Sequence, residues 1–263
     1  MMTLRLANFL SPVLHRTYEY IASYLGDSIG IPTQLTVGQS LEEFAEGQAD
    51  VGFLCGLLYT HVADQPTCPV ELLAAPILQG ERYQGKPIYF SDVIVRRETR
   101  YNSFDDLQGC RWAYNEPASH SGYNLVCYSL LERGKSPHYF GQTLKTGSHL
   151  ASLQAVLEGR ADAAALDSHM LDVFLLHNEE VAAQIRVVAM LGPSPIPPVV
   201  VAKRLGSALK CKIQEAICTM HHDPLGADWL REGLIDRFVV IADEQYQDIR
   251  EMFTPVQEAG FQL

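Results

Sequence analysis

Strand-like and helix-like segments alternate along the first part of the chain, and this alternation constrains the fold more than any single motif. Apolar runs with the length and composition of strands occupy residues 3–10, 31–38, 49–56 and 70–78. The segments between them carry helix-start signals, such as the Ser40-Leu-Glu-Glu43 capping box. Strands separated by helices predict an α/β fold with a parallel sheet.

The same alternation continues through the second part of the chain. We expect further strands at residues 86–97, 110–114, 141–145, 161–166, 185–191 and 199–202. Residues 192–198 (GPSPIPP) are expected to form a linker or rigid crossover, because proline cannot continue a helix or sit in the middle of a sheet. Residues 226–235 and 244–253 are expected to be helical and to pack on the first unit.

This order of elements predicts two α/β units. The first unit would combine residues 1–88 with 198–263, and the second would consist of residues 89–197. The crossings between them are expected near residues 85–95 and 190–200. Two lobes that are joined twice form a hinge, with a ligand cleft between them.

Composition and charge exclude several classes of protein. The chain has 263 residues and a net charge of −11 at pH 7, which argues against nucleic acid and anionic membranes as partners. It has no apolar run long enough for a membrane span, and its first residues lack the apolar stretch of a signal peptide. We expect a periplasmic protein if a leader has been removed, and a cytoplasmic one otherwise. The six cysteines show no C-x-x-C motif or zinc spacing, so buried free thiols are expected.

One polar loop stands out between an expected strand and an expected helix. The strand at residues 110–114 is followed by Ser119, His120, Ser121 and Gly122, and then by a run with helical spacing. A helix N-terminus offers unpaired backbone N–H groups, and serine hydroxyls add further donors. The loop is therefore a candidate anion site. Plain N-capping by Ser119 or Ser121, with nothing bound, explains the same residues.

Several motifs in matching order resemble one family. They are the first-unit motif at residues 49–56 (ADVGFLCG), residues 85–95 (GKPIYFSDVIV), residues 103–109 (SFDDLQG), the Ser-His-Ser-Gly loop, residues 146–149 (TGSH) and residues 162–167 (DAAALD). Together they resemble the phosphate/phosphite/phosphonate-binding solute receptors, the PhnD-like proteins of ABC transporters. The resemblance implies an α/β fold of the type-2 periplasmic-binding-protein class, with two Rossmann-like lobes, two hinge strands and an interlobe cleft. It also implies a transporter permease as partner.

The resemblance also implies roles for particular residues. It makes Ser119, His120 and Ser121 contacts of a bound oxyanion. His149 falls where a family histidine donates to the same group, and Ser148 would cap the helix that begins there. Tyr89, on the expected first hinge strand, falls where a family aromatic residue faces the ligand.

Two departures from the family pattern restrict the class of ligand that we expect. Receptors for aminoalkylphosphonates place one carboxylate shortly after the Asp-containing strand and another in the second crossover. Here the first position holds His169 and the second falls near Ile196, while Asp167 is the nearest acid. A ligand ammonium would lack its partners and would be costly to desolvate. We therefore expect that an aminoalkylphosphonate is not the ligand.

Other candidate residues have simpler explanations. Asn8 and Cys55 end expected strands of the first unit, where doubly wound folds bind ligands. Cys55 is either a nucleophile or, as we expect, a small apolar wall residue. Asp92 either bonds the loop at Asn115 or is solvated.

His221 and His222 suggest a metal, but adjacent histidines on a helix point apart, and we expect no metal site.

The function expected from these observations is a solute-binding protein that closes around a small anion, phosphonate-like or phosphate-like, without a catalytic step or cofactor. The rival is a cytosolic enzyme of the same fold, similar to menaquinone-pathway enzymes, that acts on a small carboxylate. In that case His120, His149 or His169 would be an acid or base, and Asp167 would orient it. A ligand-sensing domain is the third alternative.

Overall fold

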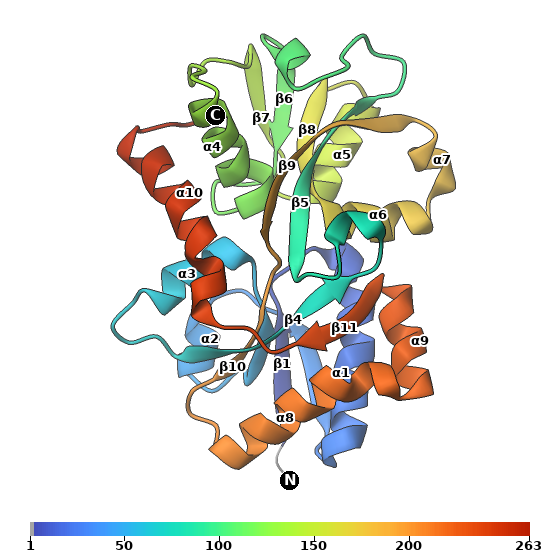
Figure 1. The fold of residues 1–263 in the computed structure, drawn as a ribbon, viewed down its shortest axis with the longest axis vertical. Helices are drawn as coiled ribbons and strands as arrows, with labels where there is room; N and C mark the ends of the chain where they lie inside the picture. The colour runs from blue at the N-terminus through green and yellow to red at the C-terminus, as the bar shows by residue number, and fades with distance from the viewer. Residues whose placement is uncertain (1–2) are drawn as a thin grey trace. The chain divides into compact units, whose positions relative to one another are not determined.

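The computed structural model describes residues 3–263, whose chain divides into two compact units (Figure 1). Unit 1 comprises Met1–Ile88 and Pro195–Gln247, and unit 2 comprises Tyr89–Ser194 and Asp248–Leu263. The chain therefore passes between the units near residues 88, 194 and 247. Within residues 3–263, no helix combines the length and the apolar content that a membrane crossing requires.

Unit 1 is built on a mixed sheet with the strand order β11-β4-β10-β3-β1-β2. Strand β1 lies between β2 and β3 and runs parallel to both, whereas β10 is antiparallel to β3 and β4. Its elements in chain order are β1 (Leu4–Asn8), η1 (Pro12–Leu14), α1 (His15–Ile29), β2 (Thr33–Val37), α2 (Glu42–Ala45), β3 (Val51–Phe53), α3 (Gly56–Ala63), β4 (Val70–Leu78), η2 (Glu81–Tyr83), β10 (Val199–Ala202), α8 (Ser207–Thr219), η5 (Met220–His222), α9 (Pro224–Glu232), β11 (Ile235–Val239) and η6 (Asp243–Tyr246).

The first helix of unit 1 illustrates how local sequence sets these elements. Tyr18, Ile21 and Leu25 recur at helical spacing and are buried, which gives α1 one apolar face. Pro12 opens the preceding turn, where a missing N–H costs nothing. Gly30 ends α1 with φ of 68°, a left-handed conformation that glycine adopts without strain.

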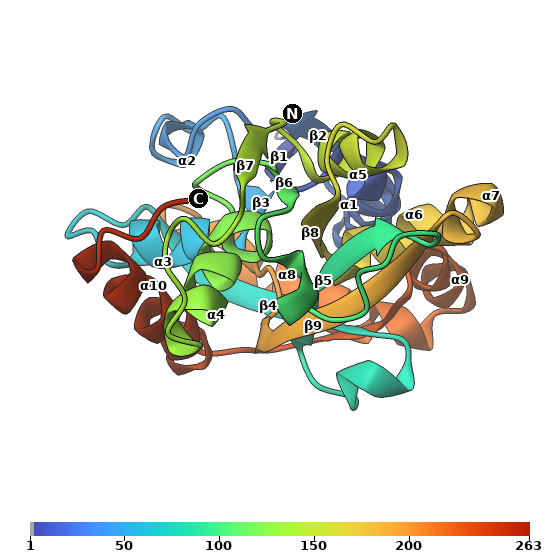
Figure 2. The ribbon, with the colours of Figure 1, turned by 90° about the horizontal axis from the view of Figure 1, so that it is seen from above.

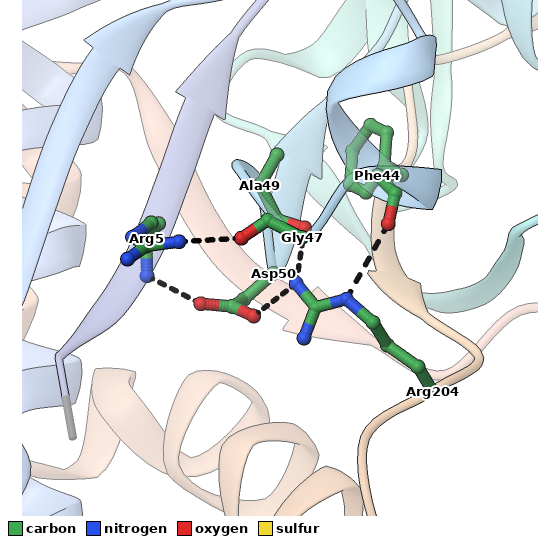
Figure 3. Close-up of polar contacts among 6 residues, drawn as sticks. All are labelled: Arg5, Phe44, Gly47, Ala49, Asp50 and Arg204. Atoms are coloured by element: carbon green, nitrogen blue, oxygen red, sulfur yellow. Dashed lines mark hydrogen bonds and ion pairs between the residues drawn. The ribbon is translucent and has the colours of Figure 1, made fainter.

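A buried carboxylate ties β1, β3 and β10 together in unit 1 (Figure 3). Asp50 Oδ2 accepts a hydrogen bond from the backbone N–H of Arg5 at 2.8 Å, and Asp50 Oδ1 accepts from Arg204 Nη2 at 2.5 Å. The Arg204 guanidinium also donates to the carbonyl oxygens of Ala49 at 2.9 Å and of Phe44 at 3.4 Å. One side chain from the segment after β10 thus fixes the loop that leads into β3.

Unit 2 has a second mixed sheet, with the strand order β7-β6-β8-β5-β9. Strand β6 is parallel to β7 and β8, and β5 is antiparallel to β8. Helices α4 and α5 lie on opposite faces of this sheet, as Figures 1 and 2 both show. Its elements are β5 (Ile88–Arg96), η3 (Asp105–Leu107), β6 (Arg111–Tyr114), η4 (His120–Asn124), α4 (Leu125–Glu132), β7 (Gln142–Lys145), α5 (His149–Leu157), β8 (Ala163–Asp167), α6 (Ser168–Leu176), α7 (Glu179–Ala182), β9 (Ile185–Pro195) and α10 (Gln247–Glu258).

An aromatic cluster forms the core of unit 2. Trp112 on β6 is fully buried and stacks on Phe140, with 4.3 Å between the ring centroids. Phe104 packs edge-on against Trp112 at 6.3 Å. The C-terminal segment closes the same core, because Val256 on α10 and Phe261 are buried in this cluster.

Several expectations about the fold were wrong. Residues 248–263 belong to unit 2 and residues 195–197 to unit 1, so the expected boundary at 198 and the packing of the last helix are corrected. The proline segment is not a linker throughout, because β9 continues to Pro195; β9 is an edge strand, where proline is tolerated. Both sheets are mixed rather than parallel, and β11 was not expected as a strand.

Candidate functional site

The carboxyl ends of β6, β7 and β8 lie at one edge of the unit 2 sheet, because these strands are parallel and adjacent. A helix begins shortly after each of them: η4 with α4 after β6, α5 after β7, and α6 after β8. Each helix start carries unpaired N–H groups and the positive end of a helix dipole. Backbone N–H donors of the kind that bind anions therefore lie together at this edge of the sheet.

Ser119 caps the first of these helices. Its Oγ accepts a hydrogen bond from the backbone N–H of Gly122 at 3.1 Å, and its carbonyl oxygen accepts from Asn124 N at 3.0 Å. The helix thus opens with a wide turn in which the bond spans five residues. This leaves the backbone N–H groups of His120 and Ser121 without a partner among residues 3–263. Of the two capping candidates, Ser119 and Ser121, Ser119 is therefore the one that caps this helix.

The His120 side chain points into unit 2, where both of its ring nitrogens have partners. Its Nε2 lies 3.0 Å from Ser194 Oγ, and its Nδ1 lies 3.3 Å from Asn124 Nδ2. Burial lowers the pKa of His120 to about 4, so the ring is neutral at pH 7. With both ring nitrogens engaged, only the backbone N–H of His120 faces the site edge as a donor.

Ser121 and His149 meet at the site edge from two different helices. Ser121 Oγ lies 3.4 Å from His149 Nε2, and the Ser121 carbonyl oxygen accepts a hydrogen bond from Ser91 Oγ at 2.6 Å. Asn115, directly after β6, places its Nδ2 3.5 Å from the same His149 Nε2. Burial lowers the pKa of His149 to about 4, so this ring is also neutral at pH 7.

The absence of a side chain at Gly122 allows the Asn115 amide and the His149 ring to approach the first turn of the helix. A Cβ atom at this position would lie 2.0 Å from Asn115 Oδ1 and 3.1 Å from His149 Cε1. The amide and the imidazole ring therefore both pack over the first turn of the helix. A larger residue would displace them.

Ser148 caps α5, as expected: its Oγ accepts a hydrogen bond from Ala151 N at 3.1 Å. Thr146 holds this second loop against the first, because its N–H and its Oγ1 both donate to the carbonyl oxygen of Tyr114, at 2.9 Å and 3.0 Å. The backbone N–H of Gly147 donates to the Asn115 carbonyl oxygen at 2.9 Å. The loops after β6 and β7 are thus fixed to each other.

Asp167 caps α6 at the end of β8, where its Oδ1 accepts a hydrogen bond from Met170 N at 2.9 Å. Burial raises the pKa of this carboxyl group to about 7, although the N–H groups of Met170 and His169 lower it. His169 is buried in the first turn of α6. Tyr89 is also buried, at the start of β5 beside this edge, since Ser91 pairs with Asp167.

The two remaining candidates lie in unit 1. Asn8 ends β1 and is buried, and its Oδ1 accepts a hydrogen bond from Leu10 N at 2.9 Å. Cys55 follows β3 at the start of α3 and is partly exposed, and it is a free thiol. The structure therefore groups Asn8 with Cys55 at the carboxyl edge of the unit 1 sheet, and the other candidates within unit 2.

The rings of His221 and His222 lie 4.0 Å apart and are tilted by 48°. In the part of the chain that the structure describes, no three histidine, cysteine or acidic side chains gather as metal ligands would.

Sequence reasoning missed two polar contributors to this edge. Asn115 was considered only as a partner of Asp92, although it is the first residue after a strand that leads into the polar loop. Ser91 lies within the expected strand at residues 86–97 and was given no role there, yet its hydroxyl donates a hydrogen bond to the Ser121 carbonyl oxygen. The position of Asn115 at a strand end was a usable signal, whereas the role of Ser91 depends on the antiparallel register of β5 and β8.

Residues 6–246 match the protein family described as "ABC transporter, phosphonate, periplasmic substrate-binding protein". The chain belongs to this family. The match covers most of unit 1, residues 89–194 of unit 2 and every candidate residue named above. This confirms the family that the sequence motifs indicated.

Solved structures of family members and relatives share the fold. A binding-protein component of an ABC phosphonate transporter from Pseudomonas aeruginosa matches with a TM-score of 0.84 and 18% identity, over 97% of this chain and 86% of that one. PhnD1 from Prochlorococcus marinus, in complex with methylphosphonate, matches with a TM-score of 0.81 and 17% identity, over 97% and 98%. A Xanthomonas citri protein bound to ATP matches with a TM-score of 0.70 and 18% identity, over 98% of each chain. The fold is that of the type-2 periplasmic binding proteins.

Proposed function

We propose that this member of the phosphonate-binding family is a periplasmic solute receptor that binds a small phosphorus oxyanion, a phosphonate or a phosphate-like ion, and presents it to an ABC transporter permease. In this proposal the anion occupies the edge of the unit 2 sheet, at the first turns of η4 and α5. Ser121, His149 and the backbone N–H groups of His120 and Ser121 supply the contacts. The protein carries out no chemical step on the ligand.

The observation that carries the proposal is the meeting of Ser121 Oγ and His149 Nε2, 3.4 Å apart, at two adjacent helix N-termini. An oxyanion placed there would accept hydrogen bonds from a hydroxyl, an imidazole and unpaired backbone N–H groups at once. Charge-assisted bonds of this kind are about twice as strong as neutral ones. The loops need no large rearrangement to supply them, because Thr146 and Gly147 already hold them together.

The electrostatics of the edge favour a site made of dipoles rather than fixed charges. Residues 115–121 and 146–149 contain no lysine or arginine. His120 and His149 are both neutral at pH 7, because burial lowers the pKa of each to about 4. Backbone N–H groups and hydroxyls therefore supply the positive potential, as in other anion sites at helix starts. This arrangement accommodates an anion in a chain with a net charge of −11.

The class of ligand follows from the family and from the acidic residues near the edge. The related Prochlorococcus protein holds methylphosphonate, which is a small phosphonate without an amino group. In this chain Asp167 is the acid nearest the expected ammonium position, and its Oδ1 already accepts the Met170 N–H as a helix cap. A carboxyl group whose pKa is about 7 is also a weak partner for a cation at neutral pH. We therefore propose a ligand without an ammonium group.

The small-carboxylate enzyme and the sensor domain are not proposed as second functions. A general base that works near neutral pH needs a pKa close to that pH. His120 and His149 both have a pKa of about 4, and the His120 ring nitrogens are engaged by Ser194 and Asn124. The Asp167 carboxyl group, with a pKa of about 7, meets this criterion, but its Oδ1 already accepts the Met170 N–H as the cap of α6. The contacts and pKa values of His120 and His149 therefore favour a binding role for their loops over acid–base chemistry by these rings.

A thermal-shift screen of the purified protein tests the proposal. Methylphosphonate, phosphite, phosphate, methanesulfonate and acetate are compared, because a ligand that binds only the native state must raise the melting temperature. We expect a rise with at least one phosphorus oxyanion and none with acetate. A flat response to every phosphorus oxyanion would contradict the proposed function.

Variants then locate the site. Ser121→Ala and His149→Ala each remove one donor and should weaken binding by about tenfold or more, as expected for a hydrogen bond to a charged group. Ser129→Ala on α4 and His138→Ala in an exposed loop are matched controls that keep the same residue types. Equal affinity in the site variants and the controls would place the ligand elsewhere.

A further inference from the structure

One buried acceptor at the proposed site has no donor. Asn115 is 6% exposed, and its Oδ1 has no hydrogen-bond partner among residues 3–263. The other end of the amide, Nδ2, faces His149 Nε2 at 3.5 Å. Buried polar atoms in native proteins are nearly always paired, because leaving one unpaired costs free energy. At a binding site, a donor on the ligand can satisfy such an acceptor.

The unpaired oxygen lies where the anion is proposed to bind. A Cβ atom at Gly122 would lie 2.0 Å from Asn115 Oδ1, so this oxygen sits directly over the first turn of the helix. The His149 ring shares that position, and Ser121 Oγ lies 3.4 Å from His149 Nε2. Donors and one unpaired acceptor thus converge on the same small volume. The oxygens of Ser119 and Asp167 do not compete for this role, because both accept backbone N–H groups as helix caps.

This combination fits an oxyanion that still carries a proton. Unprotonated oxygens accept hydrogen bonds from Ser121, His149 and the backbone, whereas an O–H group donates to Asn115 Oδ1. A hydrogen phosphonate, hydrogen phosphite or hydrogen phosphate offers both kinds of oxygen. A sulfonate has the same tetrahedral shape but no proton, so one of its oxygens would face the amide oxygen with two acceptors opposed. A site built around a substrate O–H group rejects an analogue that lacks it.

We propose that Asn115 is a specificity-determining residue that accepts a hydrogen bond from the protonated oxygen of a phosphorus oxyanion, and so selects such ligands over sulfonates. This inference rests on the proposed function, because it assigns the ligand class of that same site. It requires no proton transfer, since the ligand keeps its proton when bound.

The test compares two ligands of equal charge and similar shape. Below its second ionisation methylphosphonate is a monoanion with one O–H group, and methanesulfonate is a monoanion with none. Isothermal titration calorimetry at such a pH should show that the wild type prefers methylphosphonate by at least about tenfold, as one charge-assisted hydrogen bond implies. Asn115→Leu should remove most of this preference, mainly by weakening methylphosphonate. Asn115→Asp should keep the preference, because a carboxylate oxygen also accepts.

Controls make each outcome decisive. Asn124→Leu removes a second buried amide whose Oδ1 also has no partner among residues 3–263 but whose Nδ2 contacts His120 and not His149, and it should leave the preference unchanged. If Asn115→Leu does not fold, Asn115→Asp still tests whether the side chain at this position accepts a hydrogen bond from the ligand. Aspartate cannot donate a hydrogen bond, so the preference for methylphosphonate would be lost in this variant if the Asn115 amide acted as a donor. Equal binding of the two ligands by the wild type, or an unchanged preference in Asn115→Leu, would overturn this inference while the proposed function stands. If neither ligand binds, phosphite and phosphate are titrated in the same way, and absence of binding by all of these phosphorus oxyanions would overturn both.

Discussion

Replacing Arg204 with methionine tests the buried charge pair of unit 1. Asp50 is 6% exposed at its side chain, and its two oxygens serve different donors, the Arg5 N–H and the Arg204 guanidinium. Methionine keeps most of the aliphatic volume of arginine but donates no hydrogen bond. The Asp50 carboxylate would then remain buried with a single N–H partner. We expect a large loss of stability in unit 1 and none in unit 2.

The magnitude follows from the contacts that are lost. Removing one partner of a fully buried ion pair costs about 3–5 kcal/mol, because the other charge remains without compensation. The Arg204 side chain is 38% exposed, so water can replace part of what it gives Asp50, which lowers this contribution to about 2 kcal/mol. The bonds to the carbonyl oxygens of Ala49 and Phe44 add about 1 kcal/mol together, since net hydrogen-bond contributions are small. The expected loss is about 3 kcal/mol.

Urea unfolding can follow each unit separately because the chain has 2 tryptophans. Trp229 lies on α9 in unit 1, and Trp112 lies in the core of unit 2. A Trp112→Phe background therefore reports on unit 1 by fluorescence, and a Trp229→Phe background reports on unit 2. The free energy of unfolding of unit 1 should fall by about 3 kcal/mol in Arg204→Met.

A surface pair provides the matched control. Arg231 and Asp228 are paired on α9 with side chains that are 64% and 66% exposed, so Arg231→Met should change the free energy of unfolding by less than about 0.5 kcal/mol. Equal effects of Arg204→Met and Arg231→Met would refute the argument that burial gives the Asp50 pair its value. A loss confined to unit 2 would refute the assignment of this pair to unit 1.

Three further predictions concern unit 2 and the cysteines. Because burial raises the pKa of Asp167 to about 7, the folded state holds a proton that the unfolded state releases near pH 4. The contribution of Asp167 to stability is therefore lost as pH rises through this window, whereas His120 and His149, whose pKa values burial lowers from 6.5 to about 4, contribute with the opposite sign. The difference between wild type and Asp167→Asn in urea unfolding at several pH values isolates the Asp167 contribution, which is up to about 4 kcal/mol. Gly122→Ala should lower unfolding stability by about 1–3 kcal/mol and abolish ligand-dependent thermal shifts, because the new Cβ meets a side-chain oxygen at 2.0 Å; a variant with unchanged shifts would contradict this. Cys211 is exposed and should react with a maleimide in the native protein, whereas Cys110 and Cys127, buried and with pKa raised to about 12, should react only after unfolding, as mass spectrometry of labelled peptides can show.

Local pattern predicted the strands well where burial alone decides them. The bounds of β4 (Val70–Leu78) and β10 (Val199–Ala202) match the expected ranges, because each is an apolar run that ends at a polar residue. Strand β11 was missed because Asp236 and Arg237 interrupt its apolar residues at the edge of a sheet. The partner of α10 could not be predicted, since one apolar face fits either unit equally well.

For the candidate site, too, the sequence predicted the features that depend on local signals but not those that depend on tertiary packing. The strand, polar loop and helix around Ser119–Ser121 were predictable, because caps and periodicity are local signals. The inward direction of His120 was not, because it depends on the wide first turn that Ser119 and Asn124 form. The contact of Ser121 with His149 depends on how two loops after parallel strands pack, which sequence spacing does not specify.

The division of unit 2 between two stretches of chain has a consequence during synthesis. A ribosome completes residues 89–194 long before it reaches Asp248–Leu263, yet Val256 and Phe261 belong to the same core as Trp112. The N–H of Leu263 even donates to the Tyr123 hydroxyl, at 3.2 Å, beside the proposed site. Until those last residues emerge, the nascent chain exposes an apolar surface of unit 2, and unit 1 is assembled while its neighbour is still incomplete. Folding of the whole chain therefore waits for its final helix.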